Sequence, residues 1–139
     1  MVRAFAGITA VVGVLWGAYV ALSAAVRPPK LEYQLTTLPN GLTLVTQEDH
    51  SSPIVHLQIW YHVGSKNEKP GRTGFAHLFE HLMFKGSKNV EPEGHTSMIA
   101  AVGGQSNAYT TDDVTVFWET VPAQYLPMIL WLEAGRMAT

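Results

Sequence analysis

The chain has 139 residues, which is enough for one domain with a modest hydrophobic core. Its net charge is −2 and only 14% of its residues are charged, so the sequence provides no basic surface for nucleic acid. It contains no cysteine, which excludes disulfide bonds and thiolate metal sites.

The first predicted element is an apolar segment near the N-terminus. Residues 4–26 carry no charged side chain, and Arg3 precedes them. Such a run is typical of a signal peptide, with cleavage after Ala25, but it also reaches the ~20 residues that can span a bilayer. Its length and terminal position disfavour a buried core helix. We therefore expect residues 1–26 to form a hydrophobic leader helix, either a signal peptide or a membrane anchor. The remainder would be exported, either periplasmic or membrane-anchored and facing the periplasm.

Three strands are predicted next. Residues 31–38 and 42–49 flank "PNG", a tight-turn signal between two short extended runs. Residues 54–63 alternate between apolar and more polar side chains, a period of two that is typical of a strand with one face in the core. His56 and His62 lie on the more polar face and are interpreted as ordinary strand residues.

A helix is predicted from Gly74 to Gly86, in the sequence "GFAHLFEHLMFKG". Its apolar residues cover most of the circumference, so the helix should be buried. His77 and His81 are four residues apart and therefore lie on one face, one turn from each other. Glu80 projects close to the same point. Two imidazoles in this arrangement can bind one Zn²⁺, and a carboxylate beside them can accept a proton from water at the metal.

The composition gives the frequency with which this histidine–glutamate pattern would arise by chance. With six histidines and eight glutamates among 139 residues, it occurs in roughly one or two chains in a hundred. Burying an unpaired polar group costs about 2–7 kcal/mol, and metal coordination removes that cost. The sequence therefore favours a metal site over a coincidence.

Three more elements complete the chain. Residues 95–104 form a short helix that a pair of glycines ends, with His95 near its start and no chemistry assigned to it. Residues 107–121 are rich in β-branched and aromatic side chains and are predicted as a strand. Residues 122–139 form an apolar helix in which Pro127 requires a kink or a late start. Glu133 is interpreted as a structural partner in that helix.

The His-x-x-Glu-His pattern is the inverted zincin signature, and its surroundings resemble the M16 metallopeptidases (pitrilysin, insulinase and mitochondrial processing peptidase). The resemblance extends over residues 38–137 and is carried by "LPNGLTLV", "WYHVGSKNE", "GRTGFAHLFEHLMFKG", "GGQSNAYTTDDVTVFWETVP" and "WLEAGRM". It implies an α+β, LuxS/MPP-like metallohydrolase fold, with a mostly antiparallel sheet and helices on one face. It also implies a zinc endopeptidase in which His77 and His81 bind the metal and Glu80 is the general base.

The resemblance further implies how a substrate would bind. In the family, a strand beside the zinc accepts the substrate peptide as an added β-strand, and Asn107 and Ala108 match the pair that contacts it. Without the resemblance, Asn107 is explained equally well as a turn residue. The implied partners are a peptide or protein substrate and a further M16-like domain or subunit. A membrane is a possible partner through residues 4–26, and nucleic acid is excluded.

By the same resemblance, the third zinc ligand would be a glutamate roughly 75 residues beyond His81, which falls after Thr139. Residues 27–139 are therefore expected to be the incomplete N-terminal part of an M16-like peptidase domain, truncated and inactive by itself. Other acidic residues could reach the zinc, but none matches the family position: Glu91, Glu93, Glu119 and Glu133.

Two functions other than a peptidase are compatible with the motif. The autoinducer-synthesising, LuxS-like thioether lyases share the motif and a related fold, but they are cytosolic and use a cysteine. A non-catalytic partner subunit of an M16-type heterodimer is the second alternative. Such subunits typically lose the motif, which is intact here.

Overall fold

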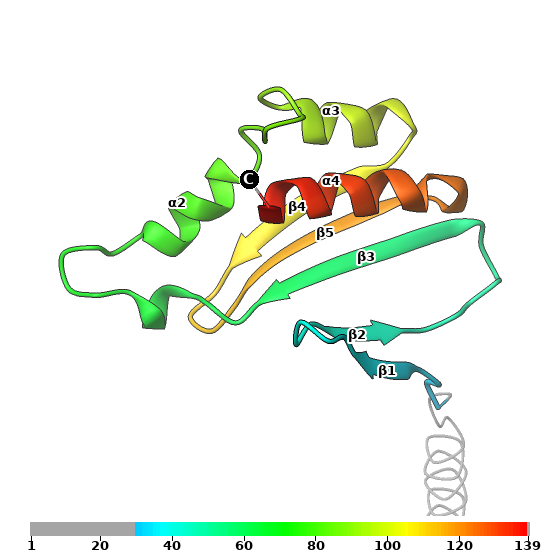
Figure 1. Cartoon of the computed structure of the whole chain (residues 1–139), viewed down its shortest axis with the longest axis horizontal. Coiled ribbons are helices and arrows are strands. Elements are labelled where there is room, and N and C mark those ends of the chain that lie inside the picture. The colour runs from blue at the N-terminus through cyan, green and yellow to red at the C-terminus, as the bar shows by residue number, and fades with distance from the viewer. Residues whose placement is uncertain (1–29, 139) are drawn as a thin grey trace, which may run out of the picture. The chain divides into compact units, whose positions relative to one another are not determined.

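The computed structural model describes residues 30–138, so the predicted leader at residues 1–26 lies outside the described residues. The chain divides into two units, Met1–Asp49 and His50–Thr139. Figure 1 shows the strands and helices of both units. Within residues 30–138, no helix combines the length and the apolar character that a membrane crossing requires.

The described part of the first unit is a β-hairpin. Strand β1 (Gln34–Thr37) pairs antiparallel with strand β2 (Thr43–Thr46). In the turn between them, the Gly41 N–H donates to the Leu38 carbonyl at 2.9 Å, and the backbone of Gly41 is left-handed, with φ of 88°. Glycine adopts that conformation without steric cost, so the predicted turn at "PNG" is confirmed.

The second unit combines a three-stranded antiparallel sheet with three α-helices. The strand order is β3–β5–β4, so β4 is an edge strand of this sheet. In chain order its elements are β3 (Ile54–Tyr61), a 3₁₀ turn (Ser65–Asn67), α2 (Phe75–Leu82), α3 (Gly94–Ala101), β4 (Gln105–Thr110), β5 (Thr115–Pro122), a second 3₁₀ turn (Ala123–Tyr125) and α4 (Leu126–Ala138). The late start of α4 matches the position of Pro127.

The segment at residues 107–121 is a hairpin rather than the single predicted strand. Strands β4 and β5 are joined by residues 111–114, where the Thr111 N–H donates to the Val114 carbonyl at 2.8 Å. The Thr111 hydroxyl oxygen also accepts the N–H groups of Asp113 at 3.3 Å and Val114 at 3.1 Å. A threonine side chain therefore satisfies the turn. Because threonine also favours strands, strand propensity alone did not predict this turn.

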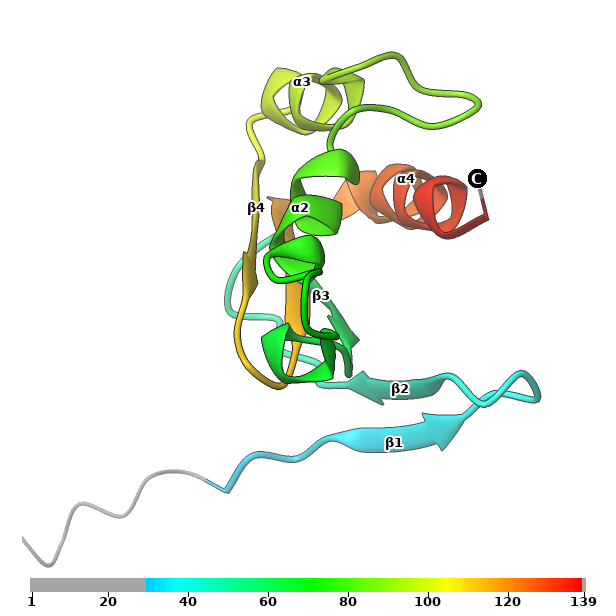
Figure 2. The ribbon, with the colours of Figure 1, turned by 90° about the vertical axis from the view of Figure 1, so that its left-hand side faces the viewer.

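The core lies on one face of the sheet. Val121 of β5 packs in a buried cluster with Ile99 of α3 and with Ile129 and Leu132 of α4. Helix α2 contacts the same face through the hydrogen bond between its Glu80 and Thr110 of β4. Thr110 lies directly opposite Thr115 of β5. Figure 2 shows the sheet nearly edge-on. The predicted α+β architecture, with an antiparallel sheet and helices on one face, is confirmed for the described residues.

Helix α2 is not buried, contrary to the prediction. Four of its apolar side chains are 44–59% exposed, namely Phe75, Leu78, Phe79 and Leu82, and Glu80 is its only buried residue. The apolar residues surround the helix, whereas β4 and β5 lie along one side of it. Among residues 50–138, the 3₁₀ turn Ser65–Asn67 also contacts α2, and most of the helix surface stays exposed. The helix also ends at Leu82, earlier than the predicted stop at Gly86.

Candidate metal centre

The start of α2 is fixed by a residue from the preceding loop. The Glu68 carboxylate accepts hydrogen bonds from the N–H of Gly74 at 2.7 Å and from the N–H of Ala76 at 2.8 Å. It thereby satisfies two of the unpaired N–H groups at the helix end and places negative charge at the positive end of the helix dipole. Gly74 is the N-cap residue of α2 and has no side chain to make the capping bonds, so Glu68 makes them.

The two predicted ligands, His77 and His81, converge. Their Nε2 atoms are 3.1 Å apart, and their ring centroids are separated by 4.7 Å. Two nitrogens that bind one tetrahedral zinc at 2.0–2.1 Å lie about 3.3–3.4 Å apart. Both imidazoles are exposed, so an ion can reach them from solvent. This donor pair therefore fits a zinc ion.

The third residue of the motif, Glu80, lies on the sheet side of α2. It is 8% exposed, and its Oε2 accepts a hydrogen bond from the Thr110 hydroxyl of β4 at 2.5 Å. No lysine or arginine among residues 30–138 pairs with this carboxylate. A nearly buried carboxylate without a cationic partner is costly, and a divalent cation beside it would offset that cost. The Glu80 carboxylate does not, however, form a group with the His77 and His81 nitrogens in which all ligand atoms lie within 4.8 Å of one another, so it lies further from the histidine pair than the sequence predicted.

Residues 30–138 bring no third protein ligand to this pair. Among residues 30–138, the one trio whose possible ligand atoms lie within 4.8 Å of one another is His95, Glu119 and Glu133. Neither of these two glutamates is therefore a ligand partner of His77 and His81 in this structure.

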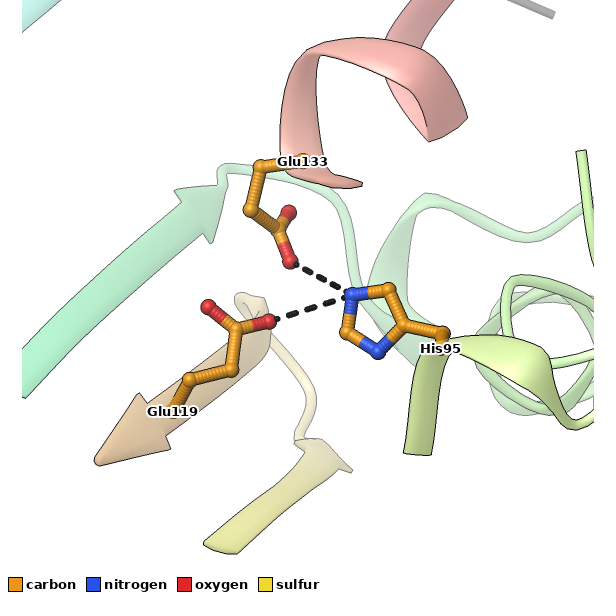
Figure 3. A group of neighbouring side chains, drawn as sticks. All are labelled: His95, Glu119 and Glu133. Atoms are coloured by element: carbon orange, nitrogen blue, oxygen red, sulfur yellow. Dashed lines mark hydrogen bonds and ion pairs between the residues drawn. The ribbon is translucent and has the colours of Figure 1, made fainter. Parts of the chain in front are cut away.

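That trio forms a separate buried cluster with Arg136, drawn without the arginine in Figure 3. The Arg136 Nε donates to Glu133 Oε2 at 2.8 Å, and its Nη2 contacts Oε1 of the same carboxylate. Nη2 also lies 3.4 Å from Glu119 Oε1. The His95 Nε2 lies 3.3 Å from Glu133 and 3.4 Å from Glu119. The guanidinium stacks 4.2 Å from the ring centroid of Phe117.

The two carboxylates of the cluster have opposite pKa shifts. Burial raises the pKa of Glu119 to about 9, and Glu133 adds to this effect through a hydrogen bond and its negative charge. For Glu133, burial alone would raise the pKa, but hydrogen bonds from His95 and Glu119 and the charge of Arg136 outweigh it and lower the pKa to about 2. Glu119 therefore holds a proton while Glu133 is ionised, and Arg136 neutralises Glu133. The cluster compensates its own charge and needs no metal.

Sequence reasoning missed this cluster in part. Glu133 was predicted to be a structural partner, whereas His95 was assigned no chemistry and Arg136 was not considered. The spacing of Glu133 and Arg136, three residues apart on a helix, is the available signal for an ion pair.

The predicted substrate residues, Asn107 and Ala108, lie on the edge strand β4. Because the Thr111–Val114 pair is hydrogen-bonded and such pairs recur at every second residue, Asn107 directs its backbone groups toward β5. The backbone groups of Ala108 and Thr110 therefore point to the free edge. The Ala108 N–H is met there by the Asn107 Oδ1 at 2.9 Å.

Comparison with known proteins adds the family context. Residues 43–133 match the sequence profile of Insulinase (Peptidase family M16). An uncharacterized zinc protease of Streptomyces coelicolor is 40% identical over 95 residues, covering 68% of this chain and 21% of the relative. The zinc protease PqqE of Helicobacter pylori is 34% identical over 139 residues, covering 99% and 30%. The mitochondrial-processing peptidase subunit beta of Blastocladiella emersonii is 36% identical, covering 66% and 20%.

Solved structures agree in fold. A protease from Helicobacter pylori superposes with a TM-score of 0.74 at 33% identity, covering 78% of this chain and 26% of that protein. Pitrilysin superposes with a TM-score of 0.71 at 26% identity, covering 78% and 12%. The chain thus spans between a fifth and a third of the length of these curated relatives.

Proposed function

The chain belongs to peptidase family M16, a zinc-dependent family, and on this premise we propose that it carries the metal-binding and proton-accepting residues of an endopeptidase that hydrolyses peptide bonds. The observation that carries the proposal is the convergence of the His77 and His81 Nε2 atoms, 3.1 Å apart, on the helix that also carries the buried Glu80.

Each residue of the motif has a proposed role. His77 and His81 hold the zinc, which when bound supplies Lewis acidity for the carbonyl of the scissile bond and for the attacking water. Glu80 accepts a proton from that water and returns it to the leaving amine, the two halves of general acid–base catalysis. The hydrogen bond from Thr110 holds Glu80 on the strand side of the helix.

Strand β4 is proposed to bind the substrate. Its free edge presents the backbone groups of Ala108 and Thr110, and an extended peptide can pair with them as an added strand. Asn107 must release the Ala108 N–H before a substrate carbonyl accepts it. Because main-chain groups make these bonds, this mode of binding tolerates many substrate sequences.

We propose that the third zinc ligand is a glutamate roughly 75 residues beyond His81, and that residues 27–139 form the first part of the peptidase domain. A further M16-like domain or subunit would cover the exposed apolar side chains of α2, such as Phe75 and Phe79. These exposed side chains support a partner surface at that side of the helix.

We also propose that residues 1–26 direct export, so that the remainder lies in the periplasm or is anchored facing it. The absence of charge in residues 4–26 supports this proposal. N-terminal sequencing of the secreted and membrane fractions separates cleavage from anchoring. Recovery of the intact chain as a soluble cytoplasmic protein would contradict both versions.

The test of the peptidase proposal replaces the base. In a chain of the relatives' length, Glu80→Gln should keep its zinc while the hydrolysis of an unstructured peptide falls by about 10²–10⁴-fold. The exposed Glu91→Gln is the matched control and should leave the rate unchanged. Near-normal hydrolysis by Glu80→Gln with zinc bound would exclude Glu80 as the base. A parent protein that binds zinc but hydrolyses no peptide would favour the non-catalytic partner subunit.

A further inference from the structure

We infer that Thr110 is a positioning residue for Glu80, which it ties to the strand on which the substrate would lie. This inference rests on the proposed function. It concerns a hydroxyl on β4, 30 residues from the glutamate that it contacts.

The first observation is that one contact orients the carboxylate. The Thr110 hydroxyl donates to Glu80 Oε2 at 2.5 Å, and among residues 30–138 no other group hydrogen-bonds this side chain. A glutamate side chain has three rotatable bonds, and Glu80 is 8% exposed, so little solvent is present to replace the bond. With Oε2 held by Thr110, Oε1 remains for the attacking water.

The second observation is that Thr110 is itself supported from behind. Its hydroxyl lies 3.3 Å from that of Thr115, directly opposite on β5, and the Thr115 hydroxyl donates to the Val63 carbonyl at 3.0 Å. Both threonines are β-branched, which restricts rotation about the first side-chain bond. Thr115 is buried. The Thr110 oxygen is therefore fixed in position, whereas its hydrogen is free to turn.

This arrangement serves both protonation states of Glu80, because each hydroxyl has one hydrogen to donate. While Glu80 is ionised, Thr110 donates to Oε2. If the proton taken from water resides on Oε1, that bond persists. If the proton resides on Oε2, Thr110 accepts it in a hydrogen bond and turns its own hydrogen to Thr115, which keeps its bond to Val63. A buried carboxyl group thus stays satisfied throughout the cycle.

The third observation links the base to the substrate strand. Ala108 and Thr110 are two residues apart on β4, so they share one face and direct their backbone groups to the same free edge. A peptide paired with this edge would bond the backbone groups of Ala108, while Thr110 holds Glu80 from the same strand. Reacting groups that are positioned by one rigid element avoid the losses in rate, about 10²-fold, that a 1 Å misplacement can cause.

The experiment removes the hydroxyl at constant shape, in a chain of the relatives' length. Thr110→Val should keep its zinc and a KM within about twofold, while kcat falls by at least about 10-fold. Thr110→Ser retains the hydroxyl and should restore kcat to within a few-fold of the parent. Thr120→Val removes a hydroxyl that bonds His56 rather than Glu80 and is the matched control, with no change in kcat expected.

A second measurement does not depend on activity. In the metal-free 139-residue chain, the ¹³C resonance of the Glu80 carboxyl group should shift in Thr110→Val and remain near the parent value in Thr110→Ser. If Thr110→Val does not fold, Thr110→Ala, which adds no bulk, takes its place in both measurements.

The outcomes distinguish a failure of the Thr110 inference from a failure of the proposed peptidase function. If the parent hydrolyses peptide and Thr110→Val has the same kcat, the inference is wrong. An unchanged Glu80 resonance in Thr110→Val would overturn it as well. A fall in kcat that Thr110→Ser does not restore would reduce Thr110 to a packing residue. A shifted resonance in a parent that hydrolyses nothing would support the contact and refute the proposed function instead.

Discussion

Two clusters of histidine and glutamate lie in the same unit of this protein and differ in how their charge is balanced. In the core, Glu119 and Glu133 each contact both His95 and the guanidinium of Arg136. On α2, His77, Glu80 and His81 have no cation among residues 30–138. The side chains are of similar types, but one cluster already contains its positive charge.

Nearness of ligand atoms does not by itself identify a metal site. The core trio has three possible ligand atoms within 4.8 Å and is almost fully buried, yet Arg136 occupies the position of the cation and makes two contacts with Glu133. The α2 cluster has two converging imidazoles open to solvent and a buried carboxylate without a counter-charge. The less complete set is therefore the better candidate for zinc.

The metal-binding residues of α2 are expected to give the strongest change on mutation. In a chain of the relatives' length, His77→Ala or His81→Ala should weaken zinc binding by more than about 100-fold, since each removes a direct ligand. His95→Ala should bind zinc as the parent does, because His95 contacts Glu119 and Glu133, whose charge is balanced by Arg136. Competition with a chromophoric chelator measures all three. Loss of zinc in His95→Ala alone would make the core cluster the metal centre.

A second prediction concerns stability. Arg136→Met keeps much of the side-chain volume but leaves Glu133 buried without its cation, and should lower the free energy of unfolding by about 3–5 kcal/mol. In the metal-free 139-residue chain, the substitution of the exposed His77 in His77→Ala should change the free energy of unfolding by no more than about 0.5 kcal/mol. Denaturant unfolding followed by circular dichroism measures both. Equal effects would mean that the core cluster is not the more strongly stabilising of the two.

The two clusters also show what a sequence can reveal. The α2 site was predictable because His77, Glu80 and His81 lie within five residues, where helical periodicity alone places them together. The strand at 54–63 and the hairpin turn at "PNG" were predictable for the same reason, since their signals are local.

Other features depend on contacts between residues far apart in the chain. Glu68 caps α2 across six residues, and Thr110 reaches Glu80 across 30, so neither has a local signature. The core cluster joins α3, β5 and α4, and a sequence cannot place His95 next to Glu133 without the fold. The exposure of α2 was also unpredictable, because the apolar residues of a helix do not show which other element, if any, packs against them.

The substrate roles of Asn107 and Ala108 stay predictions. The structure places both on the edge strand β4, where the backbone groups of Ala108 point to the free edge and those of Asn107 point toward β5. That edge position follows from the strand order, which the sequence did not reveal.

The smallest expected effect concerns the pH dependence of the core cluster. The pKa of Glu119 is raised to about 9, so between pH 4.5 and 9 the folded state retains a proton that the unfolded chain has lost, and stability falls as pH rises. The pKa of Glu133 is lowered to about 2, so its contribution is present above pH 4.5 and is lost as pH falls toward 2. The cluster should therefore be most stabilising near pH 4.5.

Glu119→Gln separates the loss of stability at alkaline pH from the loss at acidic pH. Glutamine imitates the protonated carboxyl group and still donates a hydrogen bond to Glu133. The variant should lose the decline at alkaline pH, a slope that one proton limits to about 1.4 kcal/mol per pH unit, and keep the decline at acidic pH. Denaturant midpoints of the parent, of Glu119→Gln and of the exposed control Glu91→Gln, measured from pH 3 to pH 9, test this directly. If Glu119→Gln keeps the alkaline slope of the parent, Glu119 is ionised in the fold. Arg136 would then face two buried negative charges, and the core cluster would need a second cation after all.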